Sequence, residues 1–436
     1  SALDHAILGS PFFWKVLEFL FLPSGTRFRP LSLDTPKPLF PVAGLPMIQH
    51  HIEACTRINN LKEIIILGYY PTNDLAQFVS EMNQKYKILI RYLQEFTPLG
   101  TAGGMYHFRD QVRSGNPSGF FVIHGDVCSD FPLSQMLEFH EKRPGALITV
   151  LGTEATKQQS LSIFFSGCLV CAKETSEITH YVEKPSTFVS TLINCGVYFC
   201  SIDIFQIMAD VFKKKEEAFT KNGYGSENGC SGSMQLEKEV LQPLSGTGKS
   251  FVYQITDWWS QLKSAGSAIY ANRHYLQVYR NKHPERLAKS KENQVNIIGD
   301  VYIHPSATVH PSAILGPNVS ISAFATVGPG VRIRESIVLQ EAVIADHSLV
   351  YLYSIVGRGT KVGEWTRVEG TPCDPNPNKP FAKMDNLPLF NSSGKLNPSI
   401  TVLGCSVTVP SEVILLNSIV LPYKDLTRSF KNEIIL

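Results

Sequence analysis

The stretch Ile303-His-Pro-Ser-Ala-Thr-Val309-His-Pro-Ser-Ala-Ile-Leu315-Gly-Pro-Asn-Val-Ser-Ile321 places an apolar residue at every sixth position. A second apolar residue follows four positions later, as at Ala307 and Ala313. Hexapeptide periodicity is typical of a parallel β-helix, in which each turn of the chain buries its apolar residues against the next turn. Known hexapeptide β-helices wind left-handed, against the usual handedness of crossover connections. The sequence therefore predicts a left-handed parallel β-helix of hexapeptide repeats.

Three runs carry the repeat to the end of the chain, and the second resumes one residue out of phase with the first. Their six-residue positions are Ile303, Val309, Leu315, Ile321, Val327, Ile333 and Leu339, then Ile344, Val350, Val356, Val362 and Val368, and finally Leu403, Val409, Leu415 and Leu421. The apolar partners four residues on are Ala307, Ala313, Val319, Ala325, Val331, Ile337 and Val343 in the first run and Val407, Val413 and Ile419 in the third. Residues 369–399 are rich in Pro, Asn and Lys and lack the pattern. They are predicted to form a loop extruded from the solenoid.

Some hexapeptide β-helices carry acyltransferase sites between subunits, and many mediate oligomerisation. His304, His310 and His347 are the candidate bases for acyl transfer in this chain. An isolated histidine on such a surface is more often solvated or structural. We therefore expect the β-helix to serve self-association.

Residues 24–286 follow a different pattern, in which short apolar runs alternate with longer amphipathic stretches. This alternation predicts a Rossmann-like α/β domain with a mainly parallel sheet, whose ligands bind beyond the carboxyl ends of the strands. The expected strands are Glu63–Gly68, Phe120–Ile123, Ala146–Val150 and Cys195–Phe199, and the expected helices are Met47–Arg57, Asp74–Tyr86 and Leu133–Lys142. We therefore predict a first domain at residues 1–286, a linker at 287–298 and the β-helix domain at 299–436.

The composition is that of an ordinary globular protein of 436 residues, long enough for two or three domains. Lys and Arg number 40 against 38 Asp and Glu, so no overall field favours nucleic acid or a membrane surface. The nine cysteines include one isolated CxxC, at Cys168 and Cys171, which fits a reduced, cytoplasmic protein better than a metal site. The apolar stretch Phe12–Leu22 is interrupted by Lys15 and Glu18. It is too short to span a bilayer and lacks the features of a signal peptide.

Ser24-Gly-Thr-Arg-Phe-Arg-Pro-Leu31, followed by Pro36-Lys-Pro-Leu-Phe-Pro41, has the make-up of a phosphate clamp. Gly25 lets the backbone turn tightly around a phosphate, and Arg27 and Lys37 supply positive charge. The alternative is a surface loop whose cations are merely solvated. As a combination, the segment resembles the signature of sugar-phosphate nucleotidyltransferases, which join a nucleoside triphosphate to a sugar 1-phosphate.

Four further segments of the first domain match the pattern of that family in order. Gln94–Gly104 resembles the loop that binds the nucleotide base, and Asp126 follows a predicted strand where the family holds Mg²⁺. Val182-Glu-Lys-Pro185 and Asn194-Cys-Gly-Val-Tyr198 are similar to the segments that bind the sugar phosphate. By this resemblance the nucleotide-binding residues are Gly25, Thr26, Arg27, Gln94, Gly100, Thr101 and Asp126, the sugar-binding residues are Glu183, Lys184, Asn194 and Gly196, and the catalytic cations are Arg27, Lys37 and Lys184. A lone Asp after a strand is often only a helix cap, and a Glu-Lys pair is often only solvated.

The resemblance implies attack of a sugar-phosphate oxygen on the α-phosphorus of a nucleoside triphosphate, with release of pyrophosphate. Positioning and charge neutralisation by Mg²⁺ and cations supply such catalysis. Active relatives carry a second carboxylate in a Trp-x-Asp segment, whereas Trp259-Ser-Gln-Leu-Lys263 has Gln261 at that position. A neutral amide binds Mg²⁺ more weakly than a carboxylate, and Asp257 is the nearby substitute. The site is therefore expected to be degenerate.

The start of the chain is a second departure from the family pattern. Relatives run from their first strand directly into the glycine-rich turn, whereas Ala6–Ser10 is separated from Ser24 by Pro11–Pro23. We therefore interpret residues 11–23 as an atypical apolar insert beside the triphosphate-binding turn.

The two-domain plan, Phe28-Arg-Pro-Leu-Ser32, Gln261 and the long loop together resemble the α subunits of GDP-mannose pyrophosphorylase (mannose-1-phosphate guanylyltransferase). In that family the β subunit makes GDP-mannose from GTP and mannose 1-phosphate, and the α subunit is a regulatory partner that binds GDP-mannose and restrains β. The resemblance implies that residues 369–399 contact the catalytic β subunit, with Lys379, Lys383 and Lys395 as their charges. Two alternatives stay open: an active, Mg²⁺-dependent mannose-1-phosphate guanylyltransferase that uses GTP, and a scaffold that binds no nucleotide sugar.

Overall fold

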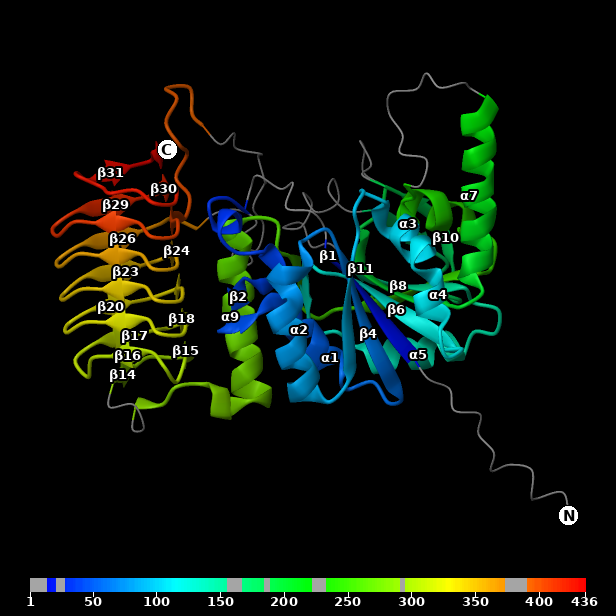
Figure 1. Ribbon diagram of the computed structural model, residues 1–436, viewed down its shortest axis with the longest axis horizontal. Helices are drawn as coiled ribbons and strands as arrows, with labels where there is room; N and C mark the ends of the chain where they lie inside the picture. The colour runs from blue at the N-terminus through cyan, green and yellow to red at the C-terminus, as the bar shows by residue number, and fades with distance from the viewer. Residues whose placement is uncertain are drawn as a thin grey trace, which may run out of the picture. The chain divides into compact units, whose positions relative to one another are not determined.

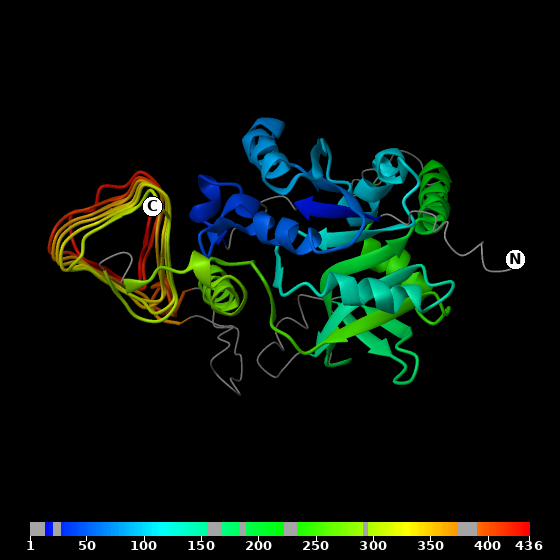
Figure 2. The ribbon, with the colours of Figure 1, turned by 90° about the horizontal axis from the view of Figure 1, so that it is seen from below.

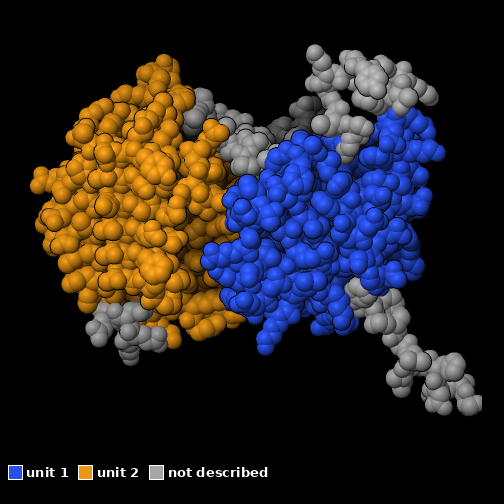
Figure 3. All heavy atoms as spheres, in the orientation of Figure 1, with its two compact units in different colours: residues 1–22, 48–259 blue, residues 23–47, 260–436 orange. Residues whose placement is uncertain are grey.

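The computed structural model describes residues 14–20, 28–154, 167–183, 189–221, 233–290, 295–372 and 390–436 (Figure 1). The chain forms two compact units, residues 1–22 with 48–259 and residues 23–47 with 260–436 (Figure 3). These units divide the chain at points other than 286 and 298, where the sequence placed the domain boundaries. Within the described ranges, no helix combines the length and the apolarity that crossing a membrane requires.

A nine-stranded mixed sheet forms the centre of the first unit. Its strands are β1 (Trp14–Leu20), β4 (Leu61–Gly68), β5 (Leu89–Gln94), β6 (Gly119–His124), β8 (Ile148–Glu154), β9 (Cys168–Cys171), β10 (Ile178–Val182), β11 (Leu192–Ser201) and β12 (Ser250–Ile255). They follow the order β10, β9, β11, β6, β1, β4, β5, and β8 pairs with both β11 and β12. The run from β6 to β5 is parallel, whereas β11 is antiparallel to β6, β8 and β9. The predicted α/β domain is confirmed.

Helices cover both faces of this sheet (Figures 1 and 2). They are α1 (Met47–Cys55), α2 (Thr72–Tyr86), α3 (Gly100–His107), α4 (Arg109–Arg113), α5 (Leu133–Glu141), α7 (Ile204–Lys221), the π-helix η5 (Leu236–Leu241) and α8 (Gln242–Leu244). The predicted helices coincide with α1, α2 and α5, and the predicted strands lie within or overlap β4, β6, β8 and β11. The last six residues of β4 are all buried, as a strand covered on both faces requires.

Strand β1 lies where the sequence analysis placed an insert. It belongs to residues 11–23, yet it pairs in parallel with β4 on one side and β6 on the other. Val16 and Leu17 are completely buried, and Nζ of the buried Lys15 forms an ion pair with Oε2 of Glu63 at 2.7 Å. Residues 14–20 are therefore a central strand of the sheet rather than an insert, because Val16 and Leu17 are buried in it and Lys15 meets a buried carboxylate. Ala6–Ser10, the expected first strand, lies outside the described residues.

The second unit contains the predicted left-handed β-helix, whose turns are triangular in cross-section (Figure 2). Three parallel sheets form its sides. The first contains β14 (Asn296–Ile297), β17 (Ile314–Leu315), β20 (Arg332–Ile333), β23 (Leu349–Tyr351), β26 (Arg367–Glu369), β29 (Ile414–Leu416) and β31 (Phe430–Lys431). The second contains β15 (Val301–Ile303), β18 (Val319–Ile321), β21 (Ser336–Val338), β24 (Ser354–Val356), β27 (Thr401–Leu403), β30 (Ile419–Val420) and β32 (Ile434–Ile435). The third contains β16 (Thr308–Val309), β19 (Thr326–Val327), β22 (Val343–Ile344), β25 (Lys361–Val362) and β28 (Thr408–Val409).

The phase shift of the hexapeptide repeat falls one hexad earlier than predicted. β18 pairs with β21 so that Ile321 lies opposite Val338, and Val338 rather than Leu339 takes the inward position. Ala342 accompanies it in the core, whereas Val343 is 36% exposed. The sequence did not resolve the shift because each of these positions has an apolar neighbour, so both phases satisfy the pattern.

Residues 28–47 pack in the second unit with the β-helix and α9 (Ala265–Lys282). They form the short helices η2 (Leu31–Leu33) and η3 (Lys37–Leu39) and the hairpin β2 (Pro41–Val42) and β3 (Leu45–Pro46). Oδ1 of Asn272 in α9 accepts hydrogen bonds from the backbone nitrogen of Ala43 and from Oγ of Ser320, both at 2.8 Å. Arg358 forms a bidentate ion pair with Asp34, with distances of 2.6 and 3.0 Å. The predicted phosphate-clamp segment therefore continues into residues held by the β-helix. The remaining short helix, η6 (Pro284–Arg286), follows α9.

The β-helix continues directly across the predicted loop 369–399. Strand β24 pairs with β27, and β26 pairs with β29. The backbone nitrogen of Thr371 donates to the carbonyl of Ser399 at 2.9 Å, which closes the base of the loop. Residues 373–389 lie outside the described part of the chain.

Candidate functional site

Two segments that the sequence analysis assigned to the site meet Trp259 in the first unit, beyond the end of β6. Asp126 follows this strand, half-buried, just before β7 (Val127–Ser129). Strand β7 pairs with β13 (Trp259–Gln261), whose first residue is the last of the first unit. The indole Nε1 of Trp259 donates to the carbonyl of Cys195 at 2.9 Å. The segment from Asn194 to Tyr198 is thereby held at the same place.

Gly196 is the most crowded point of this cluster. Its φ is +73°, a left-handed conformation that favours glycine. A Cβ at this position would lie 2.9 Å from Nδ1 of His124 and 3.2 Å from Cγ2 of Val127. Gly196 is therefore required both by its backbone conformation and by its neighbours.

A directed chain of hydrogen bonds starts at Asn194. Its amide nitrogen donates to the hydroxyl of Tyr198 at 2.8 Å, and that hydroxyl donates to Oε1 of Glu237 at 2.8 Å. The direction is fixed because a carboxylate only accepts. The amide oxygen of Asn194 accepts from the backbone nitrogen of Gly196 at 2.9 Å, and Nε2 of His124 lies 3.5 Å from Oε1 of Glu237. The amide of Asn194 is thus engaged with the protein and orients the site.

Glu183 joins the same network through Tyr181. The hydroxyl of Tyr181 donates to Oε2 of Glu183 and lies 3.4 Å from the amide nitrogen of Asn194. Burial, reinforced by Glu183 and Glu237, raises the pKa of Tyr181 above its usual value. Burial and Glu237 raise the pKa of Tyr198 in the same way. Both tyrosines therefore remain protonated and act as donors to carboxylates.

The predicted base loop is attached to a segment that the sequence analysis did not single out, residues 233–241. Met234 donates its backbone nitrogen to the carbonyl of Leu99 at 2.7 Å and accepts from the nitrogen of Gly103 at 3.0 Å. The φ of Gly100 is +71°, and a Cβ there would lie 2.6 Å from the carbonyl oxygen of Met234. Gly100 is therefore needed for this close backbone approach.

Gln94 and Glu95 stand at the carboxyl end of β5. Oε1 of Gln94 accepts from the hydroxyl of Thr72 at 3.0 Å. Burial raises the pKa of Glu95 to about 7, and no described group hydrogen-bonds its Oε1 atom. Thr101 is buried at the start of α3. Gln94, Thr101 and Asp126 thus belong to one compact unit.

Glu237 is the residue of this cluster that the sequence analysis missed. It lies in the π-helix η5, a rare element that is frequent at functional sites. The sequence of its segment carries no family motif, and its pattern is typical of an ordinary amphipathic helix. The signal that identifies it is tertiary, because the buried Tyr198 hydroxyl donates to its carboxylate.

The other predicted site residues are placed elsewhere or are not described. Lys37 and Gln261 belong to the second unit, where Nζ of Lys37 lies 5.9 Å from the ring centre of Phe28. Gln261 is half-buried, and Asp257 is exposed. Gly25, Thr26, Arg27, Lys184, Lys379 and Lys383 lie outside the described residues.

The donors present do not fit a resident Mg²⁺ ion. No group of three or more His, Cys, Asp and Glu side chains is arranged to hold a metal anywhere in the described ranges. Asp126 supplies one carboxylate, Asp257 is exposed and Gln261 supplies only a neutral amide. Mg²⁺ demands near-octahedral oxygen coordination and is held through carboxylates and substrate phosphates.

The histidines of the β-helix have structural partners. Nδ1 of His304 lies 2.8 Å from Oγ of Ser306, and Nδ1 of His310 lies 2.8 Å from Oγ of Ser312. His347 stacks on Trp365 with ring centres 4.4 Å apart. These contacts agree with a structural role rather than with acyl transfer.

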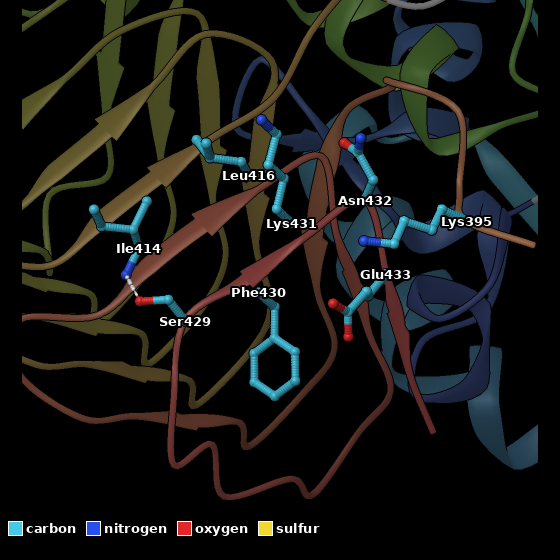
Figure 4. Close-up of a pocket in the computed structure, with 8 residues that line it drawn as sticks. All are labelled: Lys395, Ile414, Leu416, Ser429, Phe430, Lys431, Asn432 and Glu433. Carbon is cyan, nitrogen blue, oxygen red and sulfur yellow. Dashed lines mark hydrogen bonds between the residues drawn. The ribbon is translucent and has the colours of Figure 1, made fainter. Parts of the chain in front are cut away.

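A pocket of about 450 Å³ lies in the last turns of the β-helix (Figure 4). Its lining residues are Lys395, Ile414, Leu416, Ser429, Phe430, Lys431, Asn432 and Glu433. The backbone nitrogen of Leu396 donates to the carbonyl of Asn432 at 2.9 Å. The returning end of the predicted partner loop is thus attached beside this pocket.

Comparisons with known proteins cover both parts of the chain. Residues 24–226 match the family model of nucleotidyl transferases, and residues 297–435 match the GMPPB C-terminal domain. The mannose-1-phosphate guanylyltransferase regulatory subunit alpha of Drosophila melanogaster is 62% identical, over 94% of this chain and 97% of the relative. The Homo sapiens protein of the same name is 54% identical, and the mannose-1-phosphate guanyltransferase alpha-A of Xenopus laevis is 56% identical, each with the same shares covered. The nucleotidyl transferase match begins at Ser24, so β1 precedes it.

Proposed function

Because this chain belongs to the family of mannose-1-phosphate guanylyltransferase regulatory subunits alpha, we propose that it binds GDP-mannose and restrains a catalytic β subunit. The observation that carries this proposal is the poor donor set for a metal. By the family resemblance, Gln261 takes the position of a carboxylate in the active relatives, and Asp257 is exposed. Orientation of a triphosphate by Mg²⁺ is then weak, while binding of a finished nucleotide sugar needs no metal-dependent chemistry.

We assign nucleotide-sugar binding to the predicted family segments. Gln94, Gly100 and Thr101 serve the base, and Arg27 and Lys37 neutralise the diphosphate. Glu183, Lys184, Asn194 and Gly196 serve the sugar, with Asn194 acting through the orientation of Tyr198 and Tyr181. The clustering of Asp126, Glu183 and Asn194 in one unit supports this assignment.

We assign the contact with the catalytic subunit to residues 369–399. The backbone hydrogen bond from Thr371 to Ser399 closes the base of this loop on the β-helix. Lys395 is exposed where the loop returns. The β-helix supports self-association, and the free thiols of Cys168, Cys171, Cys195, Cys200 and Cys405 support a cytoplasmic location.

The alternative is an active mannose-1-phosphate guanylyltransferase that uses GTP and Mg²⁺. The test is pyrophosphate release by the purified chain, alone, with GTP, mannose 1-phosphate and Mg²⁺. We expect no release above the protein-free background, and lower turnover when the chain is added to its catalytic partner with GDP-mannose. Steady pyrophosphate release by the chain alone would establish the active enzyme instead.

A companion variant tests the positional match of Gln261. Gln261→Asp restores a carboxylate and is expected to raise Mg²⁺ affinity, measured by calorimetry with MgCl₂, while the control Gln254→Asp at an exposed position leaves it unchanged. Equal Mg²⁺ affinity of both variants would show that Gln261 does not occupy the metal position.

A further inference from the structure

We propose that residues 233–241 form a strap that joins the base loop to the sugar side of the nucleotide-sugar site, with Glu237 as the positioning residue at its sugar end. This inference rests on the proposed function, since it concerns the same site. It adds a segment and a residue that no family motif of the chain includes.

The first end of the strap holds the base loop through backbone atoms. Met234 is completely buried and bonds with its nitrogen to Leu99 and with its carbonyl to Gly103. Gly100 lies between these two contacts, and only a glycine permits the approach of the Met234 carbonyl. The position of the loop is therefore fixed by the strap.

An ion pair and two hydrogen bonds also anchor the strap, at its first residues and near its last. Nζ of Lys215 in α7 donates to the carbonyl of Ser233 and forms an ion pair with Oε1 of Glu239. The other oxygen of Glu239 accepts from the backbone nitrogen of Gln235 at 2.7 Å. These contacts hold the first turn of η5, while the carboxylate of Glu237 contacts Tyr198 and His124.

Glu237, in the first turn of η5, sets the direction of the hydrogen bonds beside the sugar segment. Glu237 accepts a hydrogen bond from the hydroxyl of Tyr198, so the oxygen of Tyr198 accepts one from Asn194. The amide of Asn194 is thereby held with its nitrogen toward Tyr198 and its oxygen toward Gly196. Without an acceptor at position 237, the Tyr198 hydroxyl loses its fixed direction and turns its proton toward Asn194. The amide of Asn194 keeps the bond from Gly196 but loses the one it donates to Tyr198.

The strap therefore makes two separable contributions. Its backbone end acts on the loop assigned to the base, and its carboxylate end acts on the segments assigned to the sugar. A change of Glu237 alone is expected to affect recognition of the sugar and not of the nucleotide.

The test compares GDP with GDP-mannose by titration calorimetry on the full chain. Glu237→Met keeps a side chain of similar size but removes both acceptor oxygens, and Tyr198→Phe removes the hydroxyl from the same chain of bonds. Each variant is expected to weaken GDP-mannose binding about tenfold, the size expected for a hydrogen bond to a charged group, and to change GDP binding less than about twofold. The double variant is expected to lose no more than either single variant, because both break one network.

The control is Glu177→Met, which removes another carboxylate that accepts a backbone hydrogen bond in the same unit, at 2.7 Å from the nitrogen of Gly248. It should leave both affinities unchanged. Equal weakening of GDP and GDP-mannose binding in Glu237→Met and Tyr198→Phe, or no change in either affinity, would overturn the strap. A wild-type chain that binds neither ligand would instead refute the proposed function.

Discussion

Replacing Gly196 with alanine tests how tightly the sugar segment is packed against the end of β6. The new Cβ would lie 2.9 Å from Nδ1 of His124 and 3.2 Å from its Cγ and from Cγ2 of Val127. The backbone would also have to keep a φ of +73° with a side chain present. Two separate costs therefore act at this position, conformational strain and crowding.

Gly248 provides a matched control because it shares only the first cost. Its φ is +74°, and a Cβ there would meet no atom within 4 Å. Strain alone predicts that Gly248→Ala lowers the free energy of unfolding by about 1–2 kcal/mol. Crowding adds about 1–3 kcal/mol at Gly196, so the two variants should differ by about that amount.

The assay is urea denaturation followed by tryptophan fluorescence, with the difference in unfolding free energy taken between the two variants. GDP-mannose binding is measured on the same samples and should fall in Gly196→Ala but not in Gly248→Ala. Equal destabilisation of the two variants, with unchanged binding in both, would show that Gly196 is not crowded by His124 and that the segments do not meet as described.

Three further predictions concern stability. Burial, with a smaller contribution from Arg143, lowers the pKa of His140 to about 4; the unfolded chain takes up this proton near pH 6.5, so stability is lost as the pH falls from about 6.5 to 4, by about 3 kcal/mol in total. Urea denaturation midpoints at pH 7 and pH 5 should show this loss in the wild type and a smaller loss in His140→Gln. An equal change in midpoint between the two pH values in both proteins would contradict the prediction. Lys15→Met removes one of the two cations paired with the buried Glu63 carboxylate, since Arg91 stays bound to its Oε1. It should lower the free energy of unfolding by about 1–2 kcal/mol, most of which the added Glu63→Leu recovers. An unchanged thermal unfolding midpoint of Lys15→Met would refute the central position of β1. Val338→Ala should lower the free energy of unfolding by about 2 kcal/mol, and Val343→Ala, at an exposed position, by less than about 0.5 kcal/mol. A larger loss in Val343→Ala than in Val338→Ala, measured by urea denaturation, would show that the phase predicted from the sequence is correct.

The β-helix could be predicted from the sequence because its signal is local and repeated. Every turn needs apolar residues at the same two positions, and many successive turns supply them. The sequence did not locate the phase shift of the repeat between Ile333 and Ile344, because neighbouring apolar residues there satisfy both possible phases. Only the strand pairing of Ile321 with Val338 decides between them.

The first unit shows why tertiary information was needed. Lys15 and Glu18 made the apolar stretch look interrupted, yet Lys15 is paired with Glu63 inside the sheet. A buried ion pair of this kind joins residues far apart in the sequence, so a local pattern does not reveal it. The family resemblance also drew attention to Ala6–Ser10 as the first strand.

The candidate site was predicted in outline but not in its connections. The motifs around Asp126 and Asn194 carried a family pattern, and the structure brings their segments together in one unit. Glu237 had no motif, and its role depends on the hydroxyl of Tyr198. Short motifs report residues that touch a ligand more readily than residues that hold those residues in place.

We propose that this chain binds GDP-mannose without making it. Titration calorimetry of GDP-mannose into the purified full chain, without a catalytic partner, tests it most directly. We predict saturable binding to the chain alone, weakened by substitution of Arg27 or Lys184. The absence of any binding heat over a range of temperatures would contradict the account and leave a scaffold assembled through its β-helix.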